Sequence, residues 1–308
     1  YWKAIKSGQM PPPPKSSFAY EKFMEYLRGA GIDIDKKGSI LTLSPLTDKH
    51  VLAKSSGEIT KPKFYKGKNM EAIKGGFFDS AVLGGFKGDR WGHMKLTEGQ
   101  VNPVFEGAVQ KLTGLGSKFN DVMSGKLHVD KDGNVNSDGE GVTGGKAIEQ
   151  LLTKIDVNDE IKVLKAKAKK VKKAELLDPI NKKLRYLTAL KTANLTPVDA
   201  YMRKVMPVLP PKYRPIYQLP SGAIETSDIN YLYHNASILN DIMKLPVMDL
   251  LGDDEKVDIR KDMYESMRGI SGLTDLNIKG KESEGFISEI KGGAGQPKEG
   301  FFISKLMS

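Results

Sequence analysis

The sequence predicts an α+β protein of about two domains. Short apolar runs broken by glycines fill residues 38–96, which favours short strands and ordered loops. Residues 145–193 carry apolar positions at helical spacing, and two further helical segments, 226–248 and 253–268, follow a proline-rich stretch. These patterns predict short strands, a Lys-rich helical region and an antiparallel helical hairpin.

Composition limits the chemistry that is available. The 308-residue chain has no cysteine, which excludes disulfides, thiolate nucleophiles and Cys-based zinc sites. No run approaches the ~18–20 apolar residues of a membrane helix, and the first residues lack the order of a signal peptide. We therefore expect a soluble, intracellular protein without membrane contact. Its net charge of +10 suits a polyanion such as nucleic acid, although solvated Lys-rich faces are common.

The first 35 residues are expected to form a small lobe. Pro11–Pro14 favour an extended polyproline conformation, and FAYEKFMEYLRGAGI predicts a short amphipathic helix that ends at its glycines. The following SILTLSPL alternates as a strand does. Because the chain opens on Tyr1-Trp2 and stops within the apolar segment FFISKLMS, we expect it to be a piece of a longer polypeptide.

Residues 111–142 are rich in Gly, Ser, Asp and Asn and are interpreted as an insertion. Their centre, KLHVDKDGNVNSDG, predicts a hairpin with its turn near Asp132-Gly133. The acidic residues of this turn do not form a calcium loop, because Val135 occupies the sixth position, where glycine is needed. They are better explained as turn chemistry.

A Lys-rich helical region and a proline-rich connector come next. Residues 162–191 carry eleven Lys or Arg against two acids, so one face is either solvated or touches phosphate. In MPVLPPKYRPIYQLPSG, five prolines prevent a helix and predict a rigid extended connector. Thr226-Ser227-Asp228 supplies N-cap candidates for the helical hairpin, whose two helices are expected to join at residues 250–252.

Neither the histidines nor the aromatic residues form a recognisable site. The four histidines lie far apart in the sequence, and none has a partner at metal-ligand spacing. We expect His93 to be a hydrogen-bonded structural residue. Phe77, Phe78 and Trp91 are expected in the core, because they lie in a strand-like setting.

Several segments resemble the β′ subunit of multisubunit DNA-dependent RNA polymerases. VMPVLPPKYRPIYQLPSGAIETSDINYLY is similar to the β′ pattern in which a VLPP..RP segment leads into the lid loop and then TSDLN..Y. SSGEITKPKFYKGKNMEAIKGGFFDSAVLGG resembles the β′ opening with its zipper loop, DRWGHMKL resembles the RMGHIEL segment, and GGKAIEQLLTKID resembles the GxxAIxxLL helix. YWKAIKSGQMPPPPKSSFAYEKFMEYLRGAGIDID resembles the end of a β subunit, which implies a β–β′ fusion.

The resemblance implies an RNA polymerase clamp-like module and a division of the chain. The implied parts are a β C-terminal-like segment (1–35), a zipper and clamp core (36–110), the insertion (111–142), clamp helices with the connector (143–215), the lid (216–228), the clamp helical hairpin (229–268) and a rudder-like and switch-like tail (269–308).

The chain departs from the family pattern at three places. Only three residues separate Gly85 from Asp89, where cellular β′ subunits have a four-Cys zinc ribbon. The lid has Ala223, Ile224 and Glu225 where the family has a basic, an aromatic and a small residue. The NADFDGD loop, whose aspartates bind the catalytic magnesium, is absent. We therefore expect no catalytic residue, metal or cofactor in this segment, and Mg²⁺ in the complete enzyme. Such pruning resembles the polymerases of large bacteriophages, which implies the cytoplasm of a bacterial host cell.

The implied function is that of a clamp and lid segment of a DNA-directed RNA polymerase, a nucleotidyltransferase, which holds DNA and the RNA–DNA hybrid during transcription. Its partners are then DNA, the hybrid and the other polymerase subunits, or the remainder of the same polypeptide. The alternative is a stand-alone basic module that binds an initiation factor or nucleic acid without polymerase activity.

The lid residues expected at nucleic acid are Leu219, Pro220, Ser221, Gly222, Ala223, Ile224 and Glu225. The zipper-like, rudder-like and switch-like residues are Lys66, Lys68, Lys74, Lys279, Lys281 and Lys305. On the helical hairpin, the positions expected to contact an initiation factor are Asn230, Asn235, Asn240 and Asp241.

Overall fold

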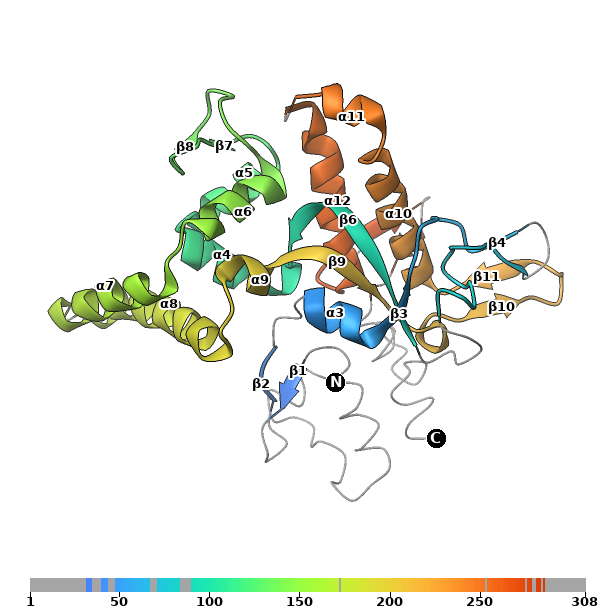
Figure 1. Cartoon of the computed structure of the whole chain (residues 1–308), viewed down its shortest axis with the longest axis horizontal. Helices are drawn as coiled ribbons and strands as arrows, with labels where there is room; N and C mark the ends of the chain where they lie inside the picture. The colour runs from blue at the N-terminus through green and yellow to red at the C-terminus, as the bar shows by residue number, and fades with distance from the viewer. Residues whose placement is uncertain are drawn as a thin grey trace, which may run out of the picture.

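The computed structural model has a small central sheet with helices on several sides, so the α+β class is confirmed (Figure 1). It describes residues 32–34, 40–43, 48–66, 71–83, 90–171, 173–252, 254–274, 276–278, 281–283 and 285. The helix expected within residues 1–31 and the segment 286–308 lie outside these ranges, as do Lys68, Lys279 and Lys305. Across the described ranges, no helix has the length and apolar character needed to cross a membrane.

The central sheet has the order β3–β6–β9, where β3 is Ser55–Glu58, β6 is Trp91–Val101 and β9 is Met202–Val208. β3 is parallel and β9 antiparallel to β6. The proline-rich segment that begins at Met206 therefore starts inside β9. It was predicted to be an extended connector, and the structure shows that its first residues are also a strand of the sheet. Pro207 is tolerated because β9 is an edge strand, where a missing amide donor costs little.

A wide bulge interrupts the pairing of β6 with β9. Lys95 lies opposite Val205 and Gln100 opposite Arg203, so residues 96–99 of β6 face only Lys204. This bulge bends β6 away from β9, and it separates the part of the sheet beneath the helical hairpin from the part that enters the helical lobe (Figure 1).

The first hydrophobic core belongs to a helical lobe. Its elements are η1 (Pro103–Phe105), α4 (Glu106–Thr113), η2 (Gly116–Lys118), α5 (Phe119–Met123), β7 (His128–Val129), β8 (Val135–Asn136), α6 (Gly144–Thr153), α7 (Val157–Lys170), α8 (Ala174–Ala193) and α9 (Pro197–Tyr201). The expected β7–β8 hairpin is present, with its turn at residues 130–134. The segment 111–142, interpreted as an insertion, packs into this core together with the residues on either side of it. Residue 111 lies inside α4, and Leu112, Phe119 and Val122 are buried in the core.

The second core lies between the sheet and the helical hairpin. The hairpin consists of α10 (Asp228–Ile242), α11 (Pro246–Leu250), η4 (Asp254–Lys256) and α12 (Val257–Ile270). Ile229, Leu232 and Met263 pack with Met94 and Val208 of the sheet. α10 ends six residues before the predicted Met248, because Pro246 cannot continue it and holds the preceding residue in an extended conformation.

The remaining elements are short. β1 (Ile32–Ile34) pairs with β2 (Ile40–Leu43), which confirms the strand expected in SILTLSPL. α3 (Asp48–Lys54) leads into β3, and its Asp48 carboxylate accepts a bond from the amide of Val205 at 3.2 Å. Three hairpins complete the set: β4 (Tyr65–Lys66) with β5 (Glu71–Ala72), β10 (Ile216–Gln218) with β11 (Ile224–Thr226), and β12 (Leu276–Ile278) with β13 (Lys281–Ser283).

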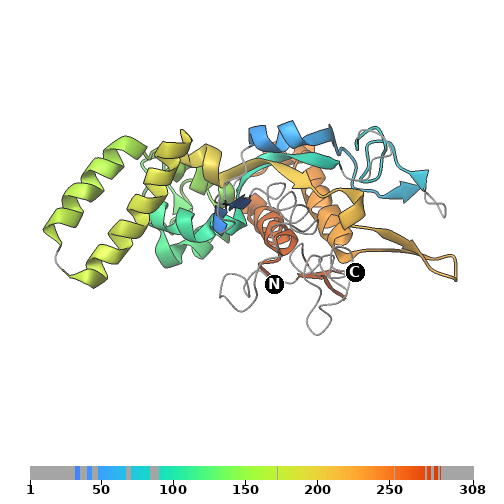
Figure 2. The ribbon, with the colours of Figure 1, turned by 90° about the horizontal axis from the view of Figure 1, so that it is seen from below.

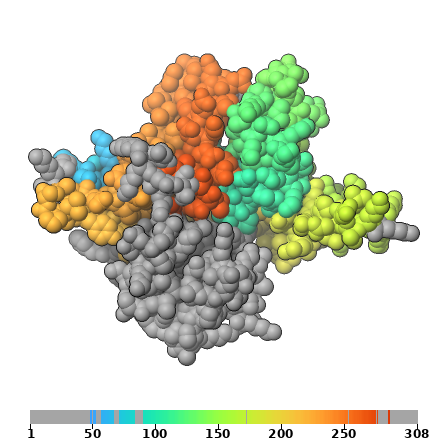
Figure 3. All heavy atoms as spheres, turned by 180° about the vertical axis from the view of Figure 1, so that it is seen from behind, coloured from blue at the N-terminus to red at the C-terminus, as the bar shows by residue number. Residues whose placement is uncertain are grey.

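Three parts project from the body. α7 and α8 form an antiparallel pair that extends away from the helical lobe, while β4–β5 and β10–β11 project at the opposite end of the long axis (Figures 1 and 2). In the space-filling view, the α7–α8 pair also stands clear of the rest of the chain (Figure 3).

Candidate nucleic-acid interface

The predicted lid is a two-stranded hairpin, β10–β11, which we call the lid hairpin. Its register pairs Ile216 with Thr226, Tyr217 with Glu225 and Gln218 with Ile224. The amide of Gly222 donates to the carbonyl of Leu219 at 2.8 Å, and the amide of Leu219 donates to that of Ala223 at 2.8 Å. Pro220 presets φ for the turn, and Gly222 has a φ of 77°, which favours glycine. The loop is therefore a closed turn that projects into solvent.

The two faces of the lid hairpin differ in exposure. Side chains alternate along a strand, so Tyr217, Leu219, Ala223 and Glu225 share one face. On this face Tyr217 is 55% and Leu219 40% exposed, whereas Ile224 is half-buried on the other. The exposed apolar surface of the lid hairpin is thus carried mainly by Tyr217 and Leu219, and less by Ile224. Sequence reasoning omitted Tyr217, although the alternation of IYQL would have placed it on the face of Leu219.

A buried arginine holds the base of the lid hairpin. Arg214 is fully buried, and its guanidinium donates to the carbonyl of Leu209 at 2.6 Å, the carbonyl of Phe77 at 2.5 Å and the side-chain oxygen of Asn230 at 3.1 Å. It also lies 4.5 Å from the ring centroid of Phe78. Burial lowers the pKa of Arg214 to about 10, so the group is still a cation at neutral pH. Through these bonds Arg214, which lies at the start of the lid hairpin, is linked to Leu209, Phe77 and Asn230.

Two of the asparagines expected to contact a partner lie inside the fold. Asn230 is fully buried and donates to the carbonyl of Arg214 at 3.0 Å, in addition to accepting from its guanidinium. Asn240 is 1% exposed; it accepts from the amide of Thr97 at 2.8 Å and donates to the carbonyl of Lys95 at 2.9 Å. The structure therefore corrects the prediction for these two residues. They satisfy buried backbone groups, which would otherwise lose water without replacement.

The other two polar positions of the helical hairpin are more accessible. Asn235 is half-buried and donates to the hydroxyl of Ser266 at 2.9 Å, which links α10 to α12. Asp241 is half-buried and forms an ion pair with Lys244 at 3.0 Å. Contact of either residue with a partner stays a prediction. Beyond them, α11 presents Leu250 at 85% exposure at the end of the hairpin.

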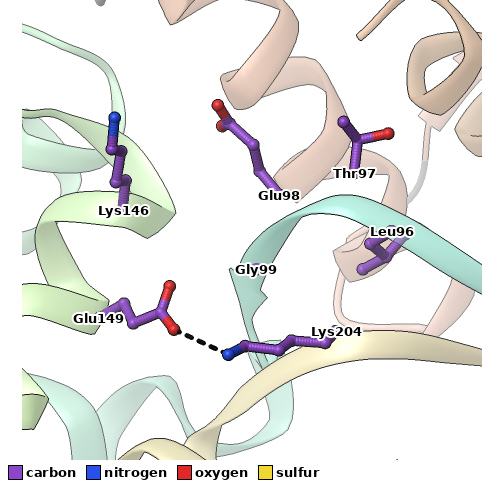
Figure 4. Close-up of a pocket in the computed structure, with 7 residues that line it drawn as sticks. All are labelled: Leu96, Thr97, Glu98, Gly99, Lys146, Glu149 and Lys204. Carbon is purple, nitrogen blue, oxygen red and sulfur yellow. Dashed lines mark ion pairs between the residues drawn. The ribbon is translucent and has the colours of Figure 1, made fainter. Parts of the chain in front are cut away.

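A buried ion pair fixes α12 to the sheet. Arg260 is 1% exposed, and two of its nitrogens bind the two oxygens of Glu98 at 2.7 and 2.9 Å. Glu98 lies in the bulge of β6, beside a hollow of about 390 Å³ that also borders α6 and β9 (Figure 4). Across this hollow, Lys204 reaches Glu149 at 3.2 Å. Two acids and two lysines line it, so it has no strong preference for an anion or a cation.

The zipper-like hairpin β4–β5 projects at the same end as the lid hairpin (Figures 1 and 2). Phe64, at its base, packs edge-on against Phe77 and Phe78 and lies 5.2 Å from the ring of His234. The predicted core role of Phe77 is confirmed, since it is fully buried, and Phe78 and Trp91 are half-buried beside the same core. Lys66 and Lys74 are exposed, which suits phosphate contact without demonstrating it. Of Lys281, only its place in β13 is described.

Two of the histidines make contacts within the fold. His93 is largely buried in β6, where burial lowers its pKa, and its carbonyl accepts from the amide of Ile59 at 2.8 Å. His128 lies 2.6 Å from a carboxylate oxygen of Asp254. In the ranges that the structure describes, no three His, Asp or Glu side chains gather as a metal site requires.

Comparison with known proteins points in one direction. The chain is 31% identical over 208 residues to the DNA-directed RNA polymerase subunit beta' of Mesoplasma florum, which covers 66% of this chain and 15% of that subunit. It is 30% identical over 146 residues to the beta' subunit of Alcanivorax borkumensis, with 47% of this chain and 10% of that subunit covered. The chain is similar to one region of β′. With the Mycoplasma capricolum beta' subunit the identity is 38% over 102 residues, or 33% of this chain and 8% of that subunit.

Similarity to these relatives supports the interpretation of this chain as a region of an RNA polymerase β′ subunit, and so as a component of a polymerase. The chain spans 15% or less of the length of each of these three β′ subunits. No protein-family profile matches it. The activity, substrates and partners of a whole β′ subunit are therefore proposals for this chain.

Proposed function

We propose that this chain is the clamp and lid segment of a DNA-directed RNA polymerase, which holds DNA and the RNA–DNA hybrid during transcription. The observation that carries the proposal is the lid hairpin. It projects from the body with an exposed apolar face, and the buried Arg214 fixes its base. Similarity to β′ subunits supplies the setting in which such a hairpin meets a hybrid.

The lid hairpin is suited to act as a passive barrier at the upstream end of the hybrid. Tyr217 and Leu219 offer apolar surface on which a terminal base pair can stack. Glu225, on the same face, repels phosphates and so disfavours continued annealing beyond that point. Phosphoryl transfer requires metal ions held near the nucleotide, and the aspartate loop for Mg²⁺ belongs to the remainder of the complete enzyme.

The helical hairpin and the exposed lysines complete the proposal. α10 and α12 correspond to the clamp helices, on which Asn235 and Asp241 are the remaining candidates for contact with an initiation factor. Lys66 and Lys74 grip phosphates without reading sequence. We further propose a β–β′ fusion of bacteriophage type, with other polymerase subunits, or the rest of the same polypeptide, completing the enzyme.

The test is a lid variant of the complete enzyme. Replacing both Tyr217 and Leu219 with serine should leave the rate of nucleotide addition on a preformed hybrid nearly unchanged, because the chemistry lies elsewhere. Transcripts on a single-stranded template should then stay annealed over a longer span, as nuclease mapping of the hybrid would show. Replacement of Ser221–Glu225 by a short glycine linker should have the same effect.

Gln218→Ser is the matched control, because Gln218 is exposed on the opposite face of the same strand. An unchanged hybrid in the double variant, or the same lengthening in the control, would contradict the barrier role. A large fall in addition rate with normal displacement would show that the hairpin serves catalysis instead.

The reading frame that encodes this chain separates the proposal from the stand-alone module. A continuation into an NADFDGD motif would support the polymerase segment. A complete gene that ends near Ser308, with no such motif in a neighbouring gene, would favour the stand-alone basic module.

A further inference from the structure

The zipper-like hairpin and the lid hairpin are anchored in one cluster of aromatic rings and a guanidinium. We call this cluster the hairpin anchor, and its members are Phe64, Phe77, Phe78, Arg214, Tyr231 and His234. Both hairpins leave the body at the same end of the molecule (Figures 1 and 2).

Phe64 is the member of the anchor that belongs to the zipper-like hairpin, because it directly precedes β4. Its ring lies 5.5 Å from that of Phe77 and 6.2 Å from that of Phe78, and both pairs are edge-on. It also lies 6.3 Å from the ring of Tyr231, again edge-on, and 5.2 Å from the ring of His234. One side chain therefore packs against both the segment that follows β5 and the first turns of α10.

The backbone fixes Phe64 to the zipper-like hairpin. The amide of Lys61 donates to the carbonyl of Gly75 at 3.1 Å, which closes the base of the hairpin. A Cβ at Gly76 would lie 2.5 Å from the carbonyl oxygen of Lys63, so the two sides of the base are in close contact. A displacement of β4–β5 therefore moves the Phe64 ring.

Arg214 and the start of α10 connect the anchor to the lid hairpin. The guanidinium lies 4.5 Å from the ring centroid of Phe78 and donates to the carbonyl of Phe77, and Arg214 lies two residues before β10. At the other end of the lid hairpin, the amide of Ser227 donates to the carbonyl of Pro215 at 3.1 Å. Both strands of the lid hairpin are therefore bound to elements that contact the Phe64 ring or its neighbours.

Filling of the core alone does not account for Phe64. Phe77 is fully buried in the second core, whereas Phe64 is half-buried at its edge. A leucine would also cover this edge, but ring pairs depend on orientation and so oppose sliding of one element past another. Four ring contacts on one half-buried side chain are suited to hold the two hairpins in a fixed relation.

We propose that Phe64 is a positioning residue that transmits the order of the zipper-like hairpin to the lid hairpin. This inference rests on the proposed function, in which Lys66 and Lys74 bind phosphates and the lid hairpin limits the length of the hybrid. Phosphate binding orders β4–β5, and a segment that packs against an ordered one has less conformational freedom left to lose. The lid hairpin is therefore held most firmly when the zipper-like hairpin is engaged by nucleic acid.

Hydrogen exchange of the 308-residue chain tests the connection without nucleic acid. Phe64→Leu keeps an apolar side chain and removes the ring. Exchange of the amides in residues 216–226 should rise by about fivefold, the lower end of the usual coupling between two sites. Exchange in α12, which belongs to the same core, should change less. Phe64→Tyr keeps the ring and should show the wild-type exchange.

Phe105→Leu is the matched control for loss of a ring. Phe105 is also half-buried, and its ring pairs with that of Tyr201 at 5.6 Å, but it packs against the first core. This variant should leave the exchange of residues 216–226 as in the wild type.

A cycle of variants in the complete enzyme tests the consequence for the hybrid. Hybrid length from nuclease mapping is compared for Phe64→Leu, for the replacement of Lys66 and Lys74 with glutamine, and for the triple variant. The first two should each lengthen the hybrid. The triple variant should lengthen it no further than the larger of the two effects, because both changes interrupt one connection.

Three results would overturn the proposal. Unchanged lid exchange in Phe64→Leu would show that the ring transmits nothing to the lid hairpin. An equal rise in Phe105→Leu, or an equal rise in α12, would show general destabilisation. Additive lengthening of the hybrid in the triple variant would show that the two hairpins act independently.

The exchange experiment needs no hybrid, so its result is independent of the barrier role of the lid hairpin. If the variant with serine at both Tyr217 and Leu219 lengthens the hybrid while Phe64→Leu changes neither exchange nor hybrid, only this inference fails. If that variant leaves the hybrid unchanged while Phe64→Leu raises lid exchange, the connection between the hairpins stands and the proposed function fails.

Discussion

Replacing Arg214 with methionine should destabilise the chain by about 3–5 kcal/mol. The guanidinium fills three buried acceptors, on Leu209, Phe77 and Asn230. Each acceptor left without a donor costs about 1–3 kcal/mol, which gives roughly 3–9 kcal/mol in total. Methionine has a similar length and no charge, so part of this cost is offset by the desolvation of the cation that no longer occurs. The lower part of this range, about 3–5 kcal/mol, is therefore expected.

Urea unfolding measures the effect. The midpoint should fall while the slope stays close to that of the wild type, because the surface exposed on unfolding is nearly the same. Arg185→Met is the matched control, since Arg185 is exposed on α8, and it should change the free energy of unfolding by less than about 0.5 kcal/mol. A change below about 1 kcal/mol in Arg214→Met would refute the reasoning that this residue fills otherwise unpaired buried groups.

A local readout separates the role of Arg214 at the lid from general destabilisation. Hydrogen exchange of the amides in residues 216–226 should increase in Arg214→Met more than exchange in α6, which belongs to the other core.

Energetic coupling between Arg214 and Asn230, measured with single and double variants, provides a second check. Asn230→Leu should add less destabilisation in the Arg214→Met background than alone, because the bond between the two side chains is already gone and only the bond to the Arg214 carbonyl remains to be lost. Full additivity would contradict the shared network.

Three further predictions concern other parts of the chain. Glu98→Gln should cost about 2–3 kcal/mol in urea unfolding, because it leaves the buried Arg260 without its carboxylate. Elemental analysis of the purified chain should find well below one zinc per chain, because it has no cysteine ligands. Burial raises the pKa of Tyr201 and Tyr233 to about 12 and also raises that of Tyr264. The folded state therefore holds these protons more tightly than the unfolded state, so stability should fall as the pH rises from about 10 to 12, and phenolate absorbance should show these tyrosines ionising only with unfolding.

The helical hairpin, the Lys-rich helical region and two of the β-hairpins could be predicted from spacing and turn chemistry alone. The exposed turn of the lid hairpin follows from Pro220 and Gly222, and the helical hairpin follows from its apolar period. The inward direction of Asn230 and Asn240 could not be predicted from residue type, since asparagine is mostly exposed. Helical spacing held a partial signal, because Ile229, Tyr233, Ala236 and Asn240 follow one another at intervals of three or four and so share the buried face.

Other features depend on contacts between distant parts of the chain, which no local pattern records. Arg214 bonds a carbonyl 137 residues away, on Phe77, and Arg260 bonds Glu98 across 162 residues. Pro207 in β9 and the prolines that follow it favour a connector over a helix, but they do not exclude an edge strand. The polar composition of residues 111–142 is typical of an insertion, although the few apolar residues among them are those that enter the core.

The same long-range bonds bear on how the proposed clamp could move. Asn230, near the start of α10, is bonded to Arg214 at the base of the lid hairpin, and Asn240, near its end, is bonded to β6. Arg260 of α12 is bonded to the bulge of the same strand. The lid hairpin, the helical hairpin and β6 are therefore joined by charged or fully buried hydrogen bonds, which are costly to break. In the proposed function, an initiation factor that binds the helical hairpin would therefore shift the lid by moving this whole assembly, and rigid-body displacement is favoured over bending of the helical hairpin alone.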